Sequence, residues 1–134
     1  MPHPEPIQIW NKTRGICLGD RVELADTFFS RLQGLLGRSG LAKGEGLIIE
    51  PCNSIHTFFM GFGIDVVFLD REQKVVAIYP ELPPWRLTRM VLKATSVIEF
   101  PAGTLAGTGT SEGDVIERMK GGSQPLSATE QGSA

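Results

Sequence analysis

The sequence predicts a mainly β fold with one helix (α+β): a compact antiparallel β barrel or sandwich, with a helix from the N-terminal half packed on it. Two observations lead to this prediction. Short runs of apolar and β-branched residues recur along the chain between turn residues, and one segment has the apolar spacing of a helix. Because helices do not alternate with the strands, a doubly wound parallel sheet is disfavoured.

The N-terminal strands are expected at residues 7–10, 16–18 and 22–24. The turn chemistry between them lies at residues 11–15 and 19–20, which are rich in Asn, Thr, Gly and Asp. Each apolar run is therefore bounded by residues that end a strand.

The period of the apolar residues then changes, and a helix is expected over residues 28–36. Its apolar face follows the i, i+4, i+7, i+8 spacing and consists of Phe28, Phe29, Leu32, Leu35 and Leu36. Asp26 or Thr27 can cap the start, and Gly37 fits the end. Gly34 costs a helix ~1 kcal/mol relative to alanine, which indicates close packing or an early end.

The remaining strands are expected at residues 47–50, 54–60, 64–69, 74–79, 95–100 and 114–119. Gly61-Phe62-Gly63 joins the second and third of these strands into a hairpin, and residues 70–73 turn into the next strand. Residues 80–86 are expected to form a loop, because their prolines remove donors from a β ladder.

The length of 134 residues fits one domain with a single core, expected at residues 7–119. The prolines at positions 2, 4 and 6 make residues 1–6 a flexible arm. Residues 120–134 contain little hydrocarbon and are expected to form a disordered tail.

Charge and hydropathy exclude several classes of protein. A net charge of −2 argues against binding to nucleic acid or to a membrane surface. Arg86, Arg89 and Lys93 form a local basic cluster, interpreted as a solvated loop. No apolar run approaches the ~20 residues that span a bilayer, and the first residues lack the features of a secretory signal. A cytoplasmic monomer with reduced Cys17 and Cys52 is therefore expected.

The stretch from residue 51 to residue 70 places polar side chains where apolar ones are usual in a folded core. Burying a polar group costs free energy unless it is paired, so these residues are candidates for a structural or functional role. If Gly61-Phe62 forms a two-residue type II′ loop, His56 faces Val67 and Asp65 lies diagonally on the same sheet face, ~7 Å away. A carboxylate there would raise the imidazole pKa, as in acid–base catalysis. A three-residue loop would put the two on opposite faces, and a structural histidine is the plainer alternative.

Two other chemistries are disfavoured. Cys52 and His56 lie ~13 Å apart along an extended strand, too far for a catalytic dyad. Residues with metal-binding side chains match no familiar ligand spacing; they are Cys52, His56, Asp65 and Asp70. No metal or other cofactor is therefore expected.

A second feature is Pro83-Pro84-Trp85-Arg86, which presents an indole beside a guanidinium. This pair can stack on a flat or cyclic ligand or hold a carboxylate. The alternative is a loop clamp, in which Trp85 covers an open barrel end and Arg86 pairs with a strand carboxylate such as Glu99. Phe58 is on the expected face of His56 and would line the same cleft.

Three groups of motifs occur in an order that resembles a known family. They are Arg31-Leu32-Gln33-Gly34-Leu35-Leu36-Gly37-Arg38 with Gly44-Glu45-Gly46-Leu47; Asn53-Ser54-Ile55-His56-Thr57-Phe58-Phe59-Met60 with Ile64-Asp65-Val66-Val67-Phe68-Leu69-Asp70; and Pro84-Trp85-Arg86, Glu99-Phe100-Pro101-Ala102-Gly103-Thr104 and Gly113-Asp114. The likeness is to the bacterial and archaeal domain of unknown function 192 (DUF192), over about residues 7–119.

This resemblance implies a small β-rich barrel or sandwich with a packed helix, and it carries no established activity. Many similar proteins begin with an export or lipoprotein signal, which is not seen here, so their compartment is not carried over. The family pattern commonly has Arg-Phe-Pro where this chain has Gly61-Phe62-Gly63. The loss of that basic residue argues against an anion contact at this tip.

The first functional hypothesis is a non-catalytic binding domain. Its cleft would hold a small polar or cyclic ligand, or a short segment of a partner, near His56, Phe58, Asp65, Trp85 and Arg86. An alternative is a hydrolase or isomerase with His56 as general base and Asp65 orienting it. A third is a protein–protein interaction module that uses an exposed strand edge or the Pro83-Pro84-Trp85 loop.

Overall fold

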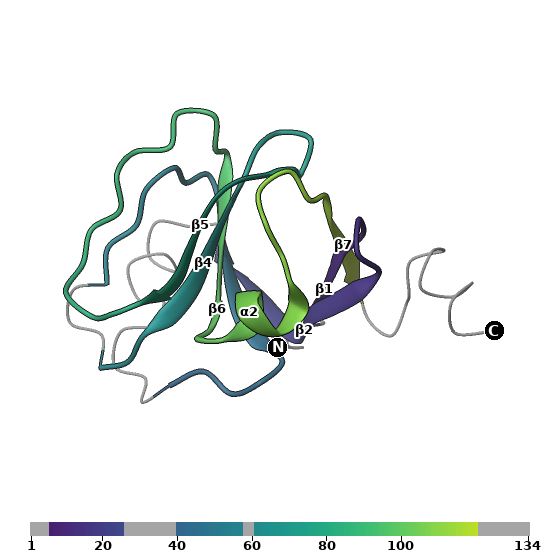
Figure 1. The fold of residues 1–134 in the computed structure, drawn as a ribbon, viewed down its shortest axis with the longest axis horizontal. Helices are drawn as coiled ribbons and strands as arrows, with labels where there is room; N and C mark the ends of the chain where they lie inside the picture. The colour runs from purple at the N-terminus through teal and green to yellow at the C-terminus, as the bar shows by residue number, and fades with distance from the viewer. Residues whose placement is uncertain (1–5, 26–39, 58–60, 121–134) are drawn as a thin grey trace, which may run out of the picture.

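The computed structural model describes residues 6–25, 40–57 and 61–120. Within these residues it forms one seven-stranded sheet with the strand order β5-β4-β6-β3-β2-β1-β7 (Figure 1). The elements are β1 (Ile7–Asn11), β2 (Ile16–Ala25), β3 (Glu45–Ile49), β4 (Ile64–Leu69), β5 (Val75–Leu82), β6 (Ser96–Pro101), α2 (Thr104–Thr108) and β7 (Ile116–Lys120). Neighbouring strands are antiparallel except β2 and β3, which are parallel. The predicted mainly β, α+β class is confirmed.

The sheet curls into a half-barrel whose two edges are hydrogen-bonded at one end. The N–H of Val75, at the start of β5, donates to the carbonyl of Asp114 at 2.8 Å. Beside it, Lys74 and Val115 form an antiparallel bridge just before β7. The edge strands β5 and β7 therefore protect part of each other's backbone from the solvent.

The curled sheet buries a different core on each face. On the concave face, Val67 of β4 packs in one cluster with Ile9 of β1 and Ile116 of β7, and Leu105 of α2 joins this cluster. On the convex face, Ile64 and Val66 of β4 pack with Ile55 and Ala94 from the long loops. Side chains alternate along a strand, so β4, with both faces covered, is buried at every position.

Two local differences from the expected elements have clear causes. Residues 16–18 and 22–24 belong to one strand, β2, because Gly19 and Asp20 form an irregularity in the ladder rather than a turn. The N–H groups of Asp20 and Arg21 both donate to the carbonyl of Gly44, as at a bulge. β5 continues through Pro80 to Leu82, which is possible because β5 is an edge strand.

Several predictions concern residues that the structure does not describe, and one element was not predicted. The helix expected over residues 28–36, most of the N-terminal arm and nearly all of the C-terminal tail lie outside the described residues. The five-residue α2 was not predicted. In the part of the chain that the structure describes, no helix is long and apolar enough to cross a membrane.

Candidate functional site

Two segments far apart in the sequence form an irregular antiparallel ribbon over the convex face of the sheet. They are residues 53–57 and 85–93, called the ribbon below; their traces run side by side at the left of Figure 1. The N–H of Thr88 donates to the carbonyl of Ile55 at 2.9 Å, and that of Val91 donates to the carbonyl of Asn53 at 2.8 Å. An antiparallel bridge pairs His56 with Leu87.

Thr57 fixes the tight turn at the start of the ribbon. Its side chain is fully buried, and its hydroxyl donates to the carbonyl of Pro83 at 2.7 Å and accepts the N–H of Arg86 at 2.8 Å. Its own N–H donates to the carbonyl of Arg86 at 2.8 Å, and its carbonyl accepts the N–H of Trp85 at 3.0 Å. Thr57 therefore fixes the backbone from Pro83 to Arg86 through hydrogen bonds of both its main chain and its side chain.

Trp85 has a strained backbone at this turn. Its φ is 64°, in the left-handed region that large side chains rarely adopt. Such a conformation persists only where the surrounding structure over-determines it, which the hydrogen bonds of Thr57 do here. The strain directs an indole that is 56% exposed away from the core.

The outer face of the ribbon is apolar and basic. Of the large hydrophobic side chains exposed in the described residues, all but Leu24 lie here: Trp85, Leu87, Met90 and Leu92. The exposed cations Arg86, Arg89 and Lys93 alternate with them. The sequence from residue 83 to residue 98 contains no Asp or Glu to neutralise these cations. A cluster of exposed apolar side chains indicates an interaction surface, whereas single exposed apolar residues do not.

The predicted hairpin between residues 54–60 and 64–69 was wrong. Val67 pairs with Ile78 of β5 on one side and with Ile98 of β6 on the other, so both edges of β4 are taken. The register in which His56 faces Val67 and Asp65 lies diagonal to it does not form. His56 lies on the exposed ribbon instead, and Phe58 falls outside the described residues.

Asp65 has a structural position on the other face of the sheet. Its carboxylate is fully buried, and each oxygen accepts a backbone N–H: Oδ1 from Glu81 at 2.7 Å and Oδ2 from Leu105 at 2.7 Å. Asp65 therefore ties the end of β5 and the first turn of α2 to β4. A carboxylate with both oxygens used in this way is poorly placed to orient an imidazole on the ribbon.

Glu99 does not pair with Arg86, contrary to the loop-clamp alternative. The Glu99 side chain is on β6 and almost wholly buried, and burial raises the pKa of its carboxyl to about 8. The guanidinium of Arg86 is exposed and its Nη1 donates to the carbonyl of Pro84 at 3.5 Å. At pH 7 the Glu99 carboxyl is therefore mostly protonated, and the Arg86 guanidinium lies at the surface, away from it.

The structure thus brings together His56, Trp85 and Arg86 and separates Asp65 from them. No group of three metal-binding side chains converges within the described residues. A cavity on the concave side, between β2 and α2, is lined by residues that were not predicted from the sequence to form a site, among them Cys17, Lys43 and Thr104. These residues come from three distant segments. Gly44 and residues 101–104 belong to the motifs that carry the family resemblance, but nothing in those motifs indicates that the segments meet.

The family model for DUF192, described as "Uncharacterized ACR", matches residues 9–118. This chain belongs to the DUF192 family. A UPF0127 protein of Thermococcus sibiricus is 36% identical to this chain over 111 residues, which cover 80% of this chain and 71% of that protein. A UPF0127 protein of Pyrococcus abyssi is 36% identical over 115 residues, covering 81% of this chain and 95% of that protein.

The fold of the DUF192 chain is also found in a solved structure. The crystal structure of a protein of unknown function from Novosphingobium aromaticivorans matches with a TM-score of 0.71 at 23% identity, over 84% of this chain and 83% of that chain. This likeness is one of fold. The chemistry of the DUF192 site therefore has to be argued from its own residues.

Proposed function

We propose that this DUF192 protein is a non-catalytic binding module that docks a short segment of a partner protein on the outer face of the ribbon. The partner segment carries apolar side chains next to Asp or Glu. The observation that carries the proposal is the exposed row of apolar side chains interleaved with Arg86, Arg89 and Lys93.

The chemistry of the surface defines the partner. Trp85, Leu87 and Met90 offer apolar area, and large aromatic and aliphatic anchors supply most of the affinity in such interfaces. The three cations lack acidic neighbours in this part of the sequence, so carboxylates on the partner would complete the charge balance. The whole chain is acidic, with a net charge of −2, so this basic patch has the opposite sign to the chain as a whole.

The ribbon is also pre-organised. Its backbone is hydrogen-bonded along its length, and Thr57 fixes the turn that holds Trp85 at a φ of 64°. A rigid surface loses less conformational entropy when a partner binds. The enzymatic alternative has less support, because Asp65 is used by two backbone N–H groups on the opposite face of the sheet.

The test is a selection of displayed random peptides on the full chain, followed by affinity measurement with the best synthetic peptide. We expect the selected peptides to combine Leu, Phe or Trp with Asp or Glu. Arg89→Glu should weaken the binding of that peptide by about tenfold or more, because it replaces attraction by repulsion. Leu87→Ser combined with Leu92→Ser should weaken it by a similar factor.

Matched controls lie on other exposed parts of the chain. Arg71→Glu reverses a surface cation in the turn before β5, and Leu24→Ser removes an exposed leucine of β2; both should leave the affinity unchanged. The proposal is overturned if no peptide is enriched, or if the enriched peptides lack acidic residues. It is equally overturned if the ribbon variants bind as tightly as the controls.

A further inference from the structure

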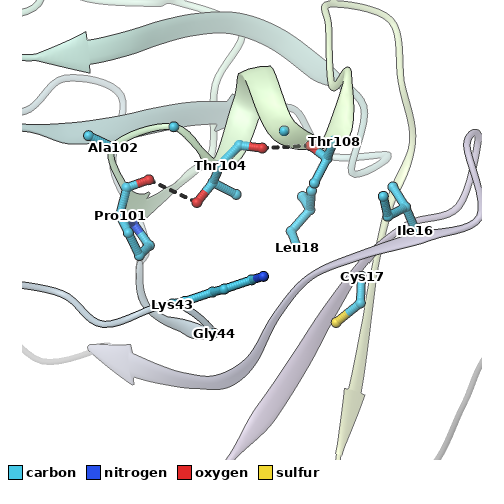
Figure 2. Close-up of a pocket in the computed structure, with 11 residues that line it drawn as sticks. Ile16, Cys17, Leu18, Lys43, Gly44, Pro101, Ala102, Thr104 and Thr108 are labelled. Atoms are coloured by element: carbon cyan, nitrogen blue, oxygen red, sulfur yellow. Dashed lines mark hydrogen bonds between the residues drawn. The ribbon is translucent and has the colours of Figure 1, made fainter.

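We propose that the cavity between β2 and α2 is a second binding site, independent of the ribbon, for a small carboxylate that also carries a hydroxyl or ammonium donor next to an apolar body. The cavity has a volume of about 640 Å³. Small-molecule sites typically measure ~300–1,000 Å³. Its walls come from the start of β2, residues 43–44 and residues 101–108 (Figure 2).

Lys43 supplies the positive charge. Figure 2 shows its side chain extending along the cavity towards Leu18 of β2. The backbone beneath it is fixed, because the Lys43 carbonyl accepts a hydrogen bond from Arg21, and the next carbonyl, that of Gly44, accepts two N–H groups of β2. Asp20, the acidic residue of that bulge, pairs with Arg21 at 3.5 Å. The Lys43 ammonium is thus presented to the cavity as a point charge for an anion.

Gly44 is needed for this arrangement. Its φ is +92°, and a Cβ there would lie 2.6 Å from Oδ1 of Asp20. The positive φ is what favours glycine here, since other residues rarely adopt it, and Asp20 would also have to move to admit a Cβ.

The α2 side of the cavity offers hydrogen-bond acceptors. The hydroxyl of Thr104 donates to the carbonyl of Pro101 at 2.8 Å, and that of Thr108 donates to the carbonyl of Thr104 at 2.8 Å (Figure 2). Each hydroxyl has one proton, so its remaining capacity is to accept. The Thr108 hydroxyl already shares a hydrogen bond of 2.7 Å with the Thr110 hydroxyl, which leaves Thr104 as the more open acceptor of the two. A ligand that meets this wall therefore has to donate, and a hydroxyl or ammonium group near its carboxylate does so. Ile16, Leu18 and Pro101 supply the apolar wall.

Cys17 lines the same cavity and indicates binding rather than covalent chemistry. Burial, together with nearby Asp20, raises the pKa of its thiol, against the lowering effect of a backbone hydrogen bond at Gly19. The thiol therefore stays protonated at pH 7 and is a poor nucleophile. It is also a natural reporter, since a ligand in the cavity would cover it.

The test is protection of Cys17 from alkylation, measured by peptide mass spectrometry of the full chain. Cys52 is an internal control, because it lies outside the cavity and is also a partly exposed cysteine. The probe is mandelate; mandelamide lacks the charge, and phenylacetate lacks the hydroxyl donor. We expect mandelate to slow the alkylation of Cys17 saturably and at least several-fold, with Cys52 unaffected and both analogues weaker.

Two variants make the result specific. Lys43→Gln changes an exposed side chain and should abolish the protection. Gly107→Leu should fill the cavity without unfolding the chain, since a Cβ at Gly107 meets no atom within 4 Å. Ala106→Leu, on the exposed side of the same helix, is the matched control and should leave the protection intact.

The inference is overturned if mandelate does not protect Cys17, or protects Cys52 equally. It is also overturned if the protection persists in Lys43→Gln. Because none of these residues belongs to the ribbon, failure here leaves the partner-docking proposal untouched, and the reverse also holds.

Discussion

Replacing Thr57 by valine tests the ribbon most sharply, because the two side chains have nearly the same shape. The change removes a hydroxyl that makes hydrogen bonds at 2.7 Å to Pro83 and at 2.8 Å from Arg86, at a fully buried position. Each such bond contributes ~1 kcal/mol net, so the free energy of unfolding should fall by ~2 kcal/mol. For a domain of this size the thermal midpoint should drop by about 8 °C.

The local effect should be larger than the global one. Without the hydroxyl, the Pro83 carbonyl and the Arg86 N–H on either side of Trp85 lose their partner, and the turn that holds Trp85 at a φ of 64° is less constrained. Hydrogen exchange at the amides of Trp85 and Arg86 should accelerate before the rest of the sheet opens. The affinity for a ribbon-binding peptide should fall as well, because the surface is no longer pre-organised.

Thr57→Ser is the matched control, since it keeps the hydroxyl and removes only a methyl group. Urea denaturation and hydrogen exchange should place it close to the wild type and well above Thr57→Val. If Thr57→Val and Thr57→Ser are equally stable and bind the peptide equally well, the clamp role of the hydroxyl is refuted.

Three further predictions concern buried acids. Asp65→Asn should lower the urea midpoint by an amount equivalent to ~2 kcal/mol, because one of its two backbone donors loses its acceptor; an unchanged midpoint would contradict the tie between β4, β5 and α2. Burial alone would raise the pKa of Asp114, but hydrogen bonds from Arg14, Asn11 and the N–H of Ser111 lower it below its ordinary value of 3.8. The stability that ionised Asp114 contributes is therefore complete above its unfolded-state pKa and is lost as the pH falls through its folded-state pKa. Arg14→Gln should make the free energy of unfolding, measured in urea, depend less on pH in this acid range. The pH dependence expected for Glu99 has the opposite sign, since its folded-state pKa is raised from 4.5 to about 8. The free energy of unfolding should decline as the pH rises between these values, and Glu99→Gln should remove the decline.

The strands that the sequence predicted share a property that can be read locally. Residues 64–69 are β-branched or apolar except for Asp65, and the structure places a strand with these bounds as β4, buried on both faces. The β1 and β6 segments were found in the same way, with boundaries that differ by a residue or so. Apolar runs of this kind specify burial and extension, which are local in origin.

The error at residues 54–60 has a different cause. A glycine-rich turn between two apolar runs normally signals a hairpin, but here β4 pairs with β5 and β6. The 53–57 segment pairs instead with residues 85–91, some thirty positions away (Thr57 with Arg86, Ile55 with Thr88). This choice depends on which edges of β4 remain open once the sheet has formed, and local sequence does not contain that information.

The candidate surface was found only in part. Trp85 and Arg86 stood out because proline and aromatic residues are conspicuous, whereas Leu87, Met90 and Leu92 were not singled out, since local sequence does not show that an apolar side chain is exposed. The cavity near Lys43 was not predicted, although Gly44 and residues 101–104 belong to the quoted motifs, because α2 is short and the walls come from distant segments.

The most direct test of the docking surface is the map of amide chemical shifts on binding the selected peptide. We expect the largest changes on residues 85–92 and on His56, with little change at Lys43 and across α2. Changes concentrated at the β2–α2 cavity, or on the β1–β7 edge with the ribbon unaffected, would contradict it.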